Sequence, residues 1–296
     1  MSKYLFIDIG GSAIKYGVYY ELGESVKEVK STLVKQTNEG SEIMDTVNEI
    51  ISNIIKLYTI DGICISSAGV IDASLGKVVY SGYTIPNYTG TPIKAIIEEN
   101  FNIPCEVEND VNCACLGEYW LGAGRDSASL VCLTVGTGVG GAIMLDNKLI
   151  NGYSHTAGEI GYMNILGENF QDLASTSSLI KRVLERKNNE DSQNLTGYQI
   201  FELARQGDVI CIEEIDKTIK MLALGITNIL YLFNPETLVL GGGIMDQKEM
   251  LKEKIDQAIS NAFVHPMFNK TTIKFAQKGN DAGLLGALYN FKNKNS

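Results

Sequence analysis

The chain has 296 residues, of which 45% are hydrophobic and 20% are charged, so it can bury one large core or two smaller ones. Its formal net charge of −10 at pH 7 repels nucleic acid and anionic membrane surfaces, and no cluster of Lys and Arg overrides that total. We therefore expect an ordinary globular protein with neither nucleic acid nor membrane among its partners.

Two further features predict a cytoplasmic location. The apolar run at the start of the chain is too short for a signal peptide, and the most apolar stretch, 221–233, is shorter than the roughly 18 residues that a membrane span needs. The six cysteines lie mostly inside apolar runs, so without a secretion signal they are expected to be reduced thiols in the core.

Segments with strand periodicity and helix periodicity alternate along the chain. In chain order we expect strands at 4–9 and 14–20, a helix at 41–57, a strand at 60–66, a helix at 93–101, a strand at 105–108, a helix at 110–121, strands at 129–135, 142–145 and 148–150, helices at 172–187, 196–205 and 208–233, a strand at 237–240, a helix at 247–263, a strand at 271–276 and a closing helix at 281–291. This alternation indicates an α/β fold. The succession of strand, glycine turn and strand occurs twice, at 8–14 and 134–143, which predicts a duplicated α/β unit with a ligand cleft between the halves.

Three glycine-rich turns follow directly on predicted strands, at 10–11, 136–141 and 241–243. Glycine has no Cβ to keep a ligand away from the backbone, so successive N–H groups can converge on an anion. The turns therefore predict a phosphate cradle, although the first turn alone also fits an ordinary hairpin. The middle turn fits a dinucleotide-binding fingerprint, with Glu159 near the acidic position, but that fingerprint must open a helix and here a hairpin follows.

Five segments together resemble the ROK sugar kinases (repressors, open reading frames, kinases): the first turn, 133–141, 152–161, the third turn and 280–286. The resemblance covers nearly the whole chain and implies an actin-like ATPase (ribonuclease H-like) fold, with two α/β domains and an interdomain cleft for ATP and a hexose. It implies a smaller domain of residues 1–110 completed by the C-terminal helix 281–296, a larger domain of residues 111–280, and a homodimer.

Within the family, segments 66–72 and 80–90 are most similar to bacterial N-acetylmannosamine kinases, and 159–163 is also similar to β-glucoside kinases. The resemblance thus implies ATP-dependent phosphorylation of a hexose 6-hydroxyl, with N-acetylmannosamine in sialic acid catabolism as first choice and glucose or a β-glucoside as the alternative. It implies Asp110 as the catalytic base and Asp8 as the residue that holds Mg²⁺, through water. Positions implied to hold the nucleotide are Asp8, Gly10, Gly11, Ser12, Lys15, Gly136, Thr137, Gly138, Gly241, Gly242 and Gly243. Positions implied to hold the sugar are Ser67, Ala68, Gly69, Asn87, Asn109, Asp110 and Glu159.

Several of these residues have plainer local interpretations. Asn109 and Asp110 are favoured N-cap residues where a helix starts, and a helix N-terminus lowers the basicity of a carboxylate. Asn87 follows a proline in a plain turn, and Glu159 could be a solvated loop charge. His155 matches no required position and is expected in a loop.

The chain departs from its relatives at the zinc site that most ROK kinases carry. Tyr162 stands where the family has a zinc-binding histidine, and no cysteine occurs from 153 to 210. Cys113 and Cys115 lack the spacing of a metal pair. We therefore expect no zinc, and we expect Tyr162 to pack or hydrogen-bond in place of that histidine and so to orient Glu159.

Three other classes of protein compete with the kinase. A ROK repressor would carry a helix-turn-helix before the first strand, which here already begins at Tyr4, and the negative charge opposes DNA binding. A sugar sensor would bind a hexose without consuming ATP, and an actin-like chaperone or filament protein would hydrolyse ATP without a sugar. Asp110 and the three phosphate turns together favour the enzyme.

Overall fold

The computed structural model describes residues 1–11, 13–26, 30–34, 36–37, 40–82, 85–187 and 195–295. The chain divides into two compact units: unit 1 consists of Met1–Arg125, Gly152–Thr156 and Asn280–Ser296, and unit 2 consists of Asp126–Asn151 and Ala157–Gly279. This division falls later than the expected boundary after residue 110, because the helix that starts at Asp110 packs within unit 1.

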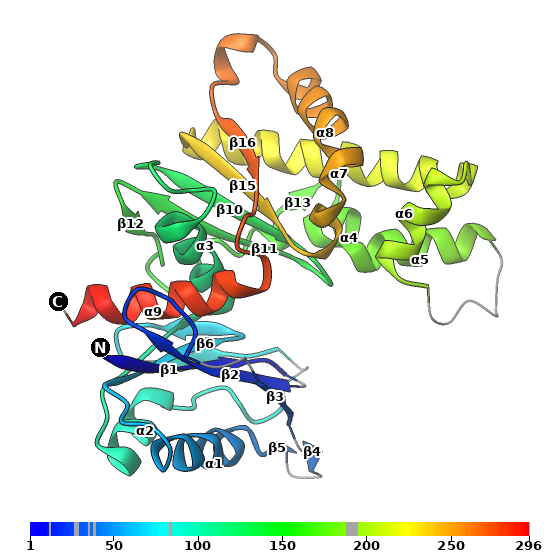
Figure 1. Ribbon diagram of the computed structural model, residues 1–296. Helices are drawn as coiled ribbons and strands as arrows, with labels where there is room; N and C mark the ends of the chain where they lie inside the picture. Colours follow the sequence, from blue (N-terminus) through cyan, green and yellow to red (C-terminus); the bar gives the residue numbers. More distant parts are fainter. Residues whose placement is uncertain are drawn as a thin grey trace. The chain divides into compact units, whose positions relative to one another are not determined.

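Unit 1 contains a five-stranded sheet in the order β3-β2-β1-β6-β9 (Figure 1). Its strands are β1 (Lys3–Ile9), β2 (Ala13–Tyr20), β3 (Lys30–Leu33), β6 (Gly62–Ser67) and β9 (Cys105–Asn109). β2 runs antiparallel to β1, whereas β6 is parallel to both β1 and β9. The carboxyl ends of β1, β6 and β9 therefore lie at one edge, where open α/β sheets bind ligands.

Helices cover both faces of this sheet (Figure 1). They are α1 (Ile43–Ile55), α2 (Ile93–Phe101), α3 (Asp110–Leu121) and α9 (Ala282–Lys294). Alternate residues of β1 face opposite sides, as the strand period requires: Leu5 and Ile7 are buried with α1 and α2, and Phe6 is buried with α3 and α9. Two small hairpins complete the described part of unit 1: β4 (Gln36–Thr37) with β5 (Gly40–Ser41), and β7 (Val70–Asp72) with β8 (Lys77–Tyr80).

Unit 2 repeats the same strand order as β12-β11-β10-β15-β16. Its strands are β10 (Leu130–Val135), β11 (Val139–Leu145), β12 (Lys148–Leu149), β15 (Thr237–Gly241) and β16 (Thr272–Phe275). Again one hairpin is antiparallel and the next two pairings are parallel. The matching order and directions confirm the expected duplication of an α/β unit.

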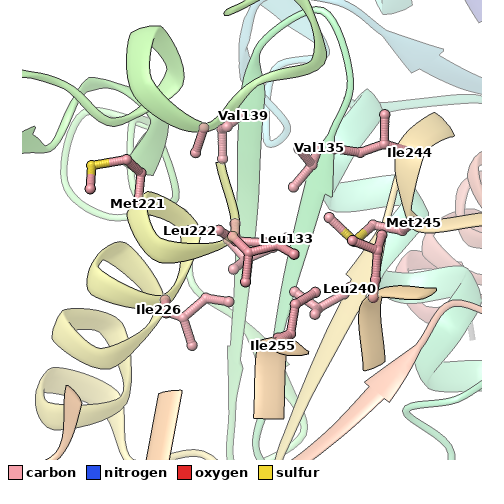
Figure 2. Packing of buried hydrophobic residues seen from close by; sticks show 14 of the residues in the cluster. Leu133, Val135, Val139, Met221, Leu222, Ile226, Leu240, Ile244, Met245 and Ile255 are labelled. Atoms are coloured by element: carbon pink, nitrogen blue, oxygen red, sulfur yellow. The ribbon is translucent and has the colours of Figure 1, made fainter. Parts of the chain in front are cut away.

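The helices of unit 2 pack on this sheet around one large apolar cluster. They are α4 (Phe170–Ala174), α5 (Thr176–Lys187), α6 (Gly197–Arg205), α7 (Val209–Phe233) and α8 (Lys248–Ala262), with short 3-10 turns η1 (Ile160–Tyr162), η2 (Gly243–Gln247), η3 (Pro266–Phe268) and η4 (Gly279–Asp281) and a small hairpin of β13 (Asn164–Ile165) and β14 (Glu168–Asn169). Leu133 on the sheet lies beside Leu222 of α7, and Leu240 lies beside Ile255 of α8 (Figure 2). The buried side chains of α7 explain why its sequence is apolar over most of its length.

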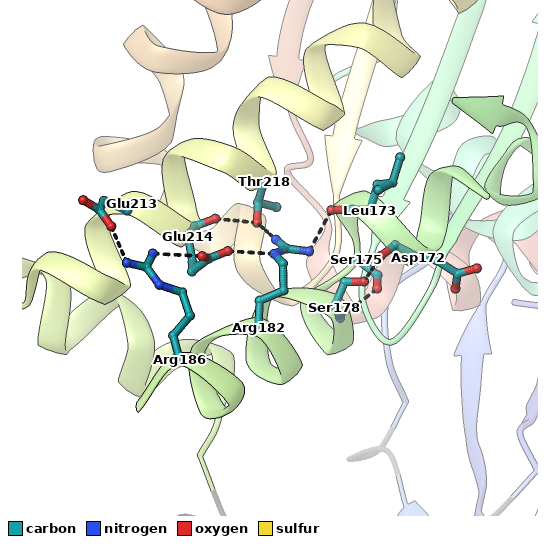
Figure 3. A network of polar contacts seen from close by, with 9 residues as sticks. All are labelled: Asp172, Leu173, Ser175, Ser178, Arg182, Arg186, Glu213, Glu214 and Thr218. Atoms are coloured by element: carbon teal, nitrogen blue, oxygen red, sulfur yellow. Dashed lines mark hydrogen bonds and ion pairs between the residues drawn. The ribbon is translucent and has the colours of Figure 1, made fainter. Parts of the chain in front are cut away.

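A polar network joins α5 to α7 (Figure 3). Glu214 is 4% exposed, and its two oxygens accept hydrogen bonds from Arg182 Nε (2.8 Å) and Arg186 Nη1 (3.0 Å). Burial raises the pKa of Glu214, but the hydrogen bonds from the two guanidinium groups outweigh burial and hold that pKa below its ordinary value. The charge is therefore compensated inside the unit, which makes this network structural.

All six cysteines are free and buried, which confirms the expectation of reduced core thiols. Among the described residues, no helix combines the length and apolar character needed to cross a membrane.

Candidate functional site

The strand register of unit 1 places three polar side chains in one row near the carboxyl edge. Asp8 on β1 lies opposite Ser66 on β6, and Ser66 lies opposite Glu108 on β9. Ser66 Oγ donates a hydrogen bond to Asp8 Oδ1 at 2.8 Å. Lys15 lies opposite Asp8 on the other side, across the β1–β2 pair. Ser12 lies outside the described residues.

Asp110 begins α3 directly after β9, and Asn109 is the N-cap. Asn109 Oδ1 accepts hydrogen bonds from the amides of Val111 (2.9 Å) and Asn112 (3.0 Å). Asp110 Oδ1 accepts from the Val111 amide and from Asn109 Nδ2, both at 2.9 Å. The capping role therefore belongs to Asn109, while Asp110 occupies the first helical position.

Burial raises the pKa of Asp110 to about 6. The Val111 amide opposes this shift, and the negative charge of Asp8 adds to it. The helix N-terminus therefore lowers the pKa of Asp110 as expected, through the Val111 amide, but burial outweighs it and the net pKa is raised. Burial also raises the pKa of Asp8, against the hydrogen bond from Ser66 and the charge of Lys15.

The segment 67–69 continues from β6 beside the start of α3. Ser67 Oγ lies 2.8 Å from Tyr88 Oη and donates to the Ala68 carbonyl at 3.0 Å. Asn109 Nδ2 donates to the Gly69 carbonyl at 2.9 Å, so the structure brings Ser67, Ala68, Gly69, Asn109 and Asp110 together.

Asn87 and Tyr88 lie in the turn that contacts this segment, and they differ in burial: Tyr88 is buried and Asn87 is exposed. Burial raises the pKa of Tyr88, which keeps its hydroxyl neutral. Asn87 is exposed at the tip of a turn with φ of 59°, a conformation that Asn tolerates better than most residues.

Two glycine turns of unit 2 also meet at the carboxyl edge of their sheet. Gly241 ends β15 opposite Thr134 of β10, so the turn at 136–138 and the turn at 241–243 are neighbours. Gly242 has φ of 97°, and a Cβ there would lie 2.3 Å from the Val135 carbonyl oxygen. Packing and backbone conformation both require glycine at this position.

Packing does not explain the glycines at 136 and 243. A Cβ on Gly136 or Gly243 would meet no atom within 4 Å, and neither residue has a left-handed φ. A ligand that approaches the backbone would explain the missing side chains. A Cβ on Gly138 would lie 2.8 Å from Gln171 Oε1. Thr137, between Gly136 and Gly138, is exposed.

Glu159 precedes η1, and partial burial raises its pKa. The turn is held by close backbone packing: a Cβ on Gly161 would lie 2.2 Å from the Val139 carbonyl oxygen, and a Cβ on Gly158 would lie 2.5 Å from that of Gly141. Tyr162 is 63% exposed, so its side chain is not packed in a core, but its backbone amide donates to the Glu159 carbonyl at 3.2 Å. Glycine contacts with β11 position the turn, and a role of Tyr162 in orienting Glu159 stays a prediction.

His155 lies in a loop as expected, with φ of 63°. Its Nε2 lies 3.5 Å from Asp72 Oδ2 within unit 1. Over the described ranges, no group of three or more His, Cys, Asp or Glu side chains could hold a metal ion.

Sequence reasoning did not single out Ser66, Tyr88, Glu108, Asn112 or Gln171. Each gains its place from strand register or from a contact with a distant segment, and only the position of Glu108 and Asn112 on either side of Asn109-Asp110 gave a local signal.

Two units with one strand order and glycine turns at their carboxyl edges define the actin-like ATPase (ribonuclease H-like) fold. A family model described as the ROK family matches residues 4–294. The chain therefore belongs to the ROK family, as its motifs indicated.

Relatives match the chain over almost its full length. It is 47% identical over 292 residues to an uncharacterised protein of Clostridium perfringens (CPE0188), covering 99% of this chain and 98% of that protein. It is 30% identical over 296 residues to a β-glucoside kinase of Klebsiella pneumoniae, covering 98% and 96%.

Two solved structures are similar to the whole fold. The Lmo2764 protein of Listeria monocytogenes, a provisional N-acetylmannosamine kinase, matches with a TM-score of 0.87 and 29% identity, covering 99% of this chain and 100% of that one. A ROK glucokinase of Streptomyces griseus in complex with glucose and AMPPNP matches with a TM-score of 0.82 and 26% identity, covering 97% and 98%.

Proposed function

We propose that this ROK chain transfers the γ-phosphoryl group of ATP to the 6-hydroxyl of a hexose, with Asp110 as the base. The observation that carries the proposal is the partly buried Asp110 carboxylate, with its pKa raised to about 6, joined through Asn109 to the segment at Gly69. Such a carboxylate is ionised at neutral pH and is more basic than an ordinary aspartate, as removal of a hydroxyl proton requires.

The remaining residues bind and orient. Asp110 Oδ1 is held by the Val111 amide and Asn109, and Oδ2 is the oxygen that we assign to the sugar hydroxyl. Ser67, Ala68 and Gly69 form a wall for the sugar. Asn87 and Glu159 add polar contacts to ring hydroxyls.

ATP and Mg²⁺ fit the residues present. The glycines at 136 and 243, whose Cβ positions are open, leave room for phosphate and adenosine against the backbone. The other positions proposed for the nucleotide are Gly10, Gly11, Ser12, Lys15, Thr137, Gly138, Gly241 and Gly242. Asp8 would hold Mg²⁺ through water, and the ion, when bound, neutralises charge on the transferred group.

N-acetylmannosamine is the proposed substrate, which would place the enzyme in sialic acid catabolism. Support comes from the structural similarity to Lmo2764 and from the segments at 66–72 and 80–90. Glucose or a β-glucoside is the second candidate, because the Klebsiella β-glucoside kinase is similar at 30% identity. We also propose a cytoplasmic homodimer; sedimentation equilibrium would measure the mass of the assembly.

The test is a coupled ADP-release assay with N-acetylmannosamine, glucose, N-acetylglucosamine and a β-glucoside. We expect sugar-dependent ADP release, highest with N-acetylmannosamine. Hexose binding without ADP release would identify a sensor, and ADP release independent of sugar would identify an actin-like ATPase.

Asp110→Asn tests the assigned base in the same assay. We expect turnover to fall by roughly 10²–10⁴-fold, with ATP affinity and the folded state retained. The matched control is Asp45→Asn, since Asp45 is an exposed aspartate in the first turn of α1, and its turnover should equal that of the parent. Near-parent turnover of Asp110→Asn would remove Asp110 from the chemistry.

A further inference from the structure

Glu108 is a buried carboxylate directly before the Asn109-Asp110 pair. Its side chain is 2% exposed, although carboxylates are rarely buried to this extent unless they are partnered. Glu108 Oε1 accepts hydrogen bonds from the Asn109 amide (2.9 Å) and from Asn112 Nδ2 (3.0 Å). One carboxylate oxygen therefore holds both the last residue of β9 and the first turn of α3.

The side chain of Asn109 is fully used inside the protein. An amide side chain has two N–H donors and an oxygen with two lone pairs. Asn109 Nδ2 donates to the Gly69 carbonyl and to Asp110 Oδ1. Asn109 Oδ1 accepts from the amides of Val111 and Asn112. A sugar hydroxyl could bind this side chain only by displacing or sharing one of these bonds.

We propose that Glu108 and Asn109 are positioning residues for Asp110, with Asn112 as the second anchor of Glu108. This inference rests on the proposed role of Asp110 as base. Glu108 fixes the backbone of Asn109, and Asn109 fixes Asp110 Oδ1, so that the orientation of Oδ2 is set before the sugar arrives. Asn109, to which the family resemblance assigns sugar binding, thus also holds Asp110.

Glu106 provides a matched comparison on the same face of β9, two residues earlier. It is 6% exposed, and its oxygens bind Lys94 Nζ (2.5 Å) and Lys294 Nζ (3.1 Å). These lysines belong to α2 and α9. Glu106 therefore joins helices to the sheet, whereas the described contacts of Glu108 lie at the catalytic junction.

The experiment compares Glu108→Gln with Glu108→Leu by steady-state kinetics and thermal melting. Gln keeps an acceptor oxygen for Asn109 and Asn112, and Leu removes it. We expect Glu108→Leu to lower kcat by about 100-fold, the typical effect of a displaced catalytic group, with the KM for ATP unchanged. Glu108→Gln should restore kcat to within about fivefold of the parent. Glu106→Leu should lower Tm and leave kcat unchanged.

If Glu108→Leu fails to fold, Asn112→Ala replaces it, and we expect the same loss of kcat by about 100-fold. Asn109→Ala should also lower kcat, because it removes the donor to Asp110 Oδ1. A folded Glu108→Leu with parent kcat, or equal losses of kcat for Gln and Leu, would overturn the inference. Asp110→Asn, measured in parallel, separates the two proposals: if Asp110→Asn is inactive and Glu108→Leu is fully active, only the positioning role fails.

Discussion

Ionisation of Asp110 favours catalysis but disfavours the folded state, because the surroundings of this residue hold its pKa at about 6. An aspartate in an unfolded chain has a pKa of about 3.9. The folded protein therefore binds the Asp110 proton more tightly than the unfolded chain does. The protonated carboxyl favours the fold, and ionisation near pH 6 weakens it, while base catalysis needs the ionised form.

We expect the sugar-kinase rate to follow the ionisation of Asp110. With a pKa of about 6, kcat/KM should be level above pH 7 and should fall about tenfold per pH unit well below 6. The measurement is a pH–rate profile of ADP release from pH 4.5 to pH 8. A profile that stays flat down to pH 4.5 would exclude Asp110 as the titrating base.

The same pKa predicts that Asp110→Asn stabilises the protein at neutral pH. A shift from 3.8 to about 6 corresponds to as much as about 3 kcal/mol in the free energy of unfolding. The cost of ionising Asp110 in the folded protein is absent below the pKa of the unfolded chain and complete above the pKa of the folded protein. The gain in the free energy of unfolding of Asp110→Asn should therefore be present at pH 7 and vanish near pH 4. Urea unfolding of both proteins at the two pH values measures it. An equal gain in the free energy of unfolding at both pH values would show that the stabilisation does not come from the ionisation of Asp110.

Local sequence predicts the bounds of some helices correctly and those of others incorrectly. The predicted bounds of α2 and α3 agree with the structure because apolar spacing and the N-cap at Asn109 mark them locally. The predicted helix at 172–187 is two helices, since Ser175 is extended and the amide of Thr176 donates to the Gly136 carbonyl. That bond joins segments far apart in sequence, so periodicity could not reveal it.

The contact between α3 and α9 depends on glycine. A Cβ on Gly286 would lie 1.7 Å from the Cys113 carbonyl oxygen, whereas a Cβ on Gly283, also in α9, would come no closer than 3.9 Å to Ser66 Oγ. We expect Gly286→Ala to destabilise the protein by about 3 kcal/mol, because the two backbones must separate. Gly283→Ala is the control and should stay within about 1 kcal/mol of the parent. Equal unfolding midpoints for the two variants in urea would contradict this close packing.

At the scale of the whole molecule, repetition made the fold predictable. The repeated glycine turn indicated two related units, and both sheets have the same order. The positions of the glycine turns at strand ends also followed from the sequence. The partners of Asp8 and Ser67 did not, because Ser66 and Tyr88 reach them through strand register and through a loop from elsewhere in the chain.

Segments proposed to contact only one of the two substrates predict separate footprints in amide hydrogen exchange. The segment Ser67–Gly69 of unit 1 is proposed to contact only the hexose, and Gly241–Gly243 of unit 2 only the nucleotide. A bound ligand slows exchange where it suppresses local opening. Hexose alone should therefore protect the peptide with 67–69, and AMPPNP with Mg²⁺ alone should protect the peptide with 241–243.

Asp110→Asn serves as a reference in the same exchange experiment, because it should keep both footprints while losing turnover. That outcome would separate binding from chemistry in one variant. Protection of 67–69 by nucleotide alone, or of 241–243 by hexose alone, would show that the assignment of the two segments is reversed. The comparison needs no assumption about the identity of the hexose, since each sugar in the kinase assay can be tested for the same footprint.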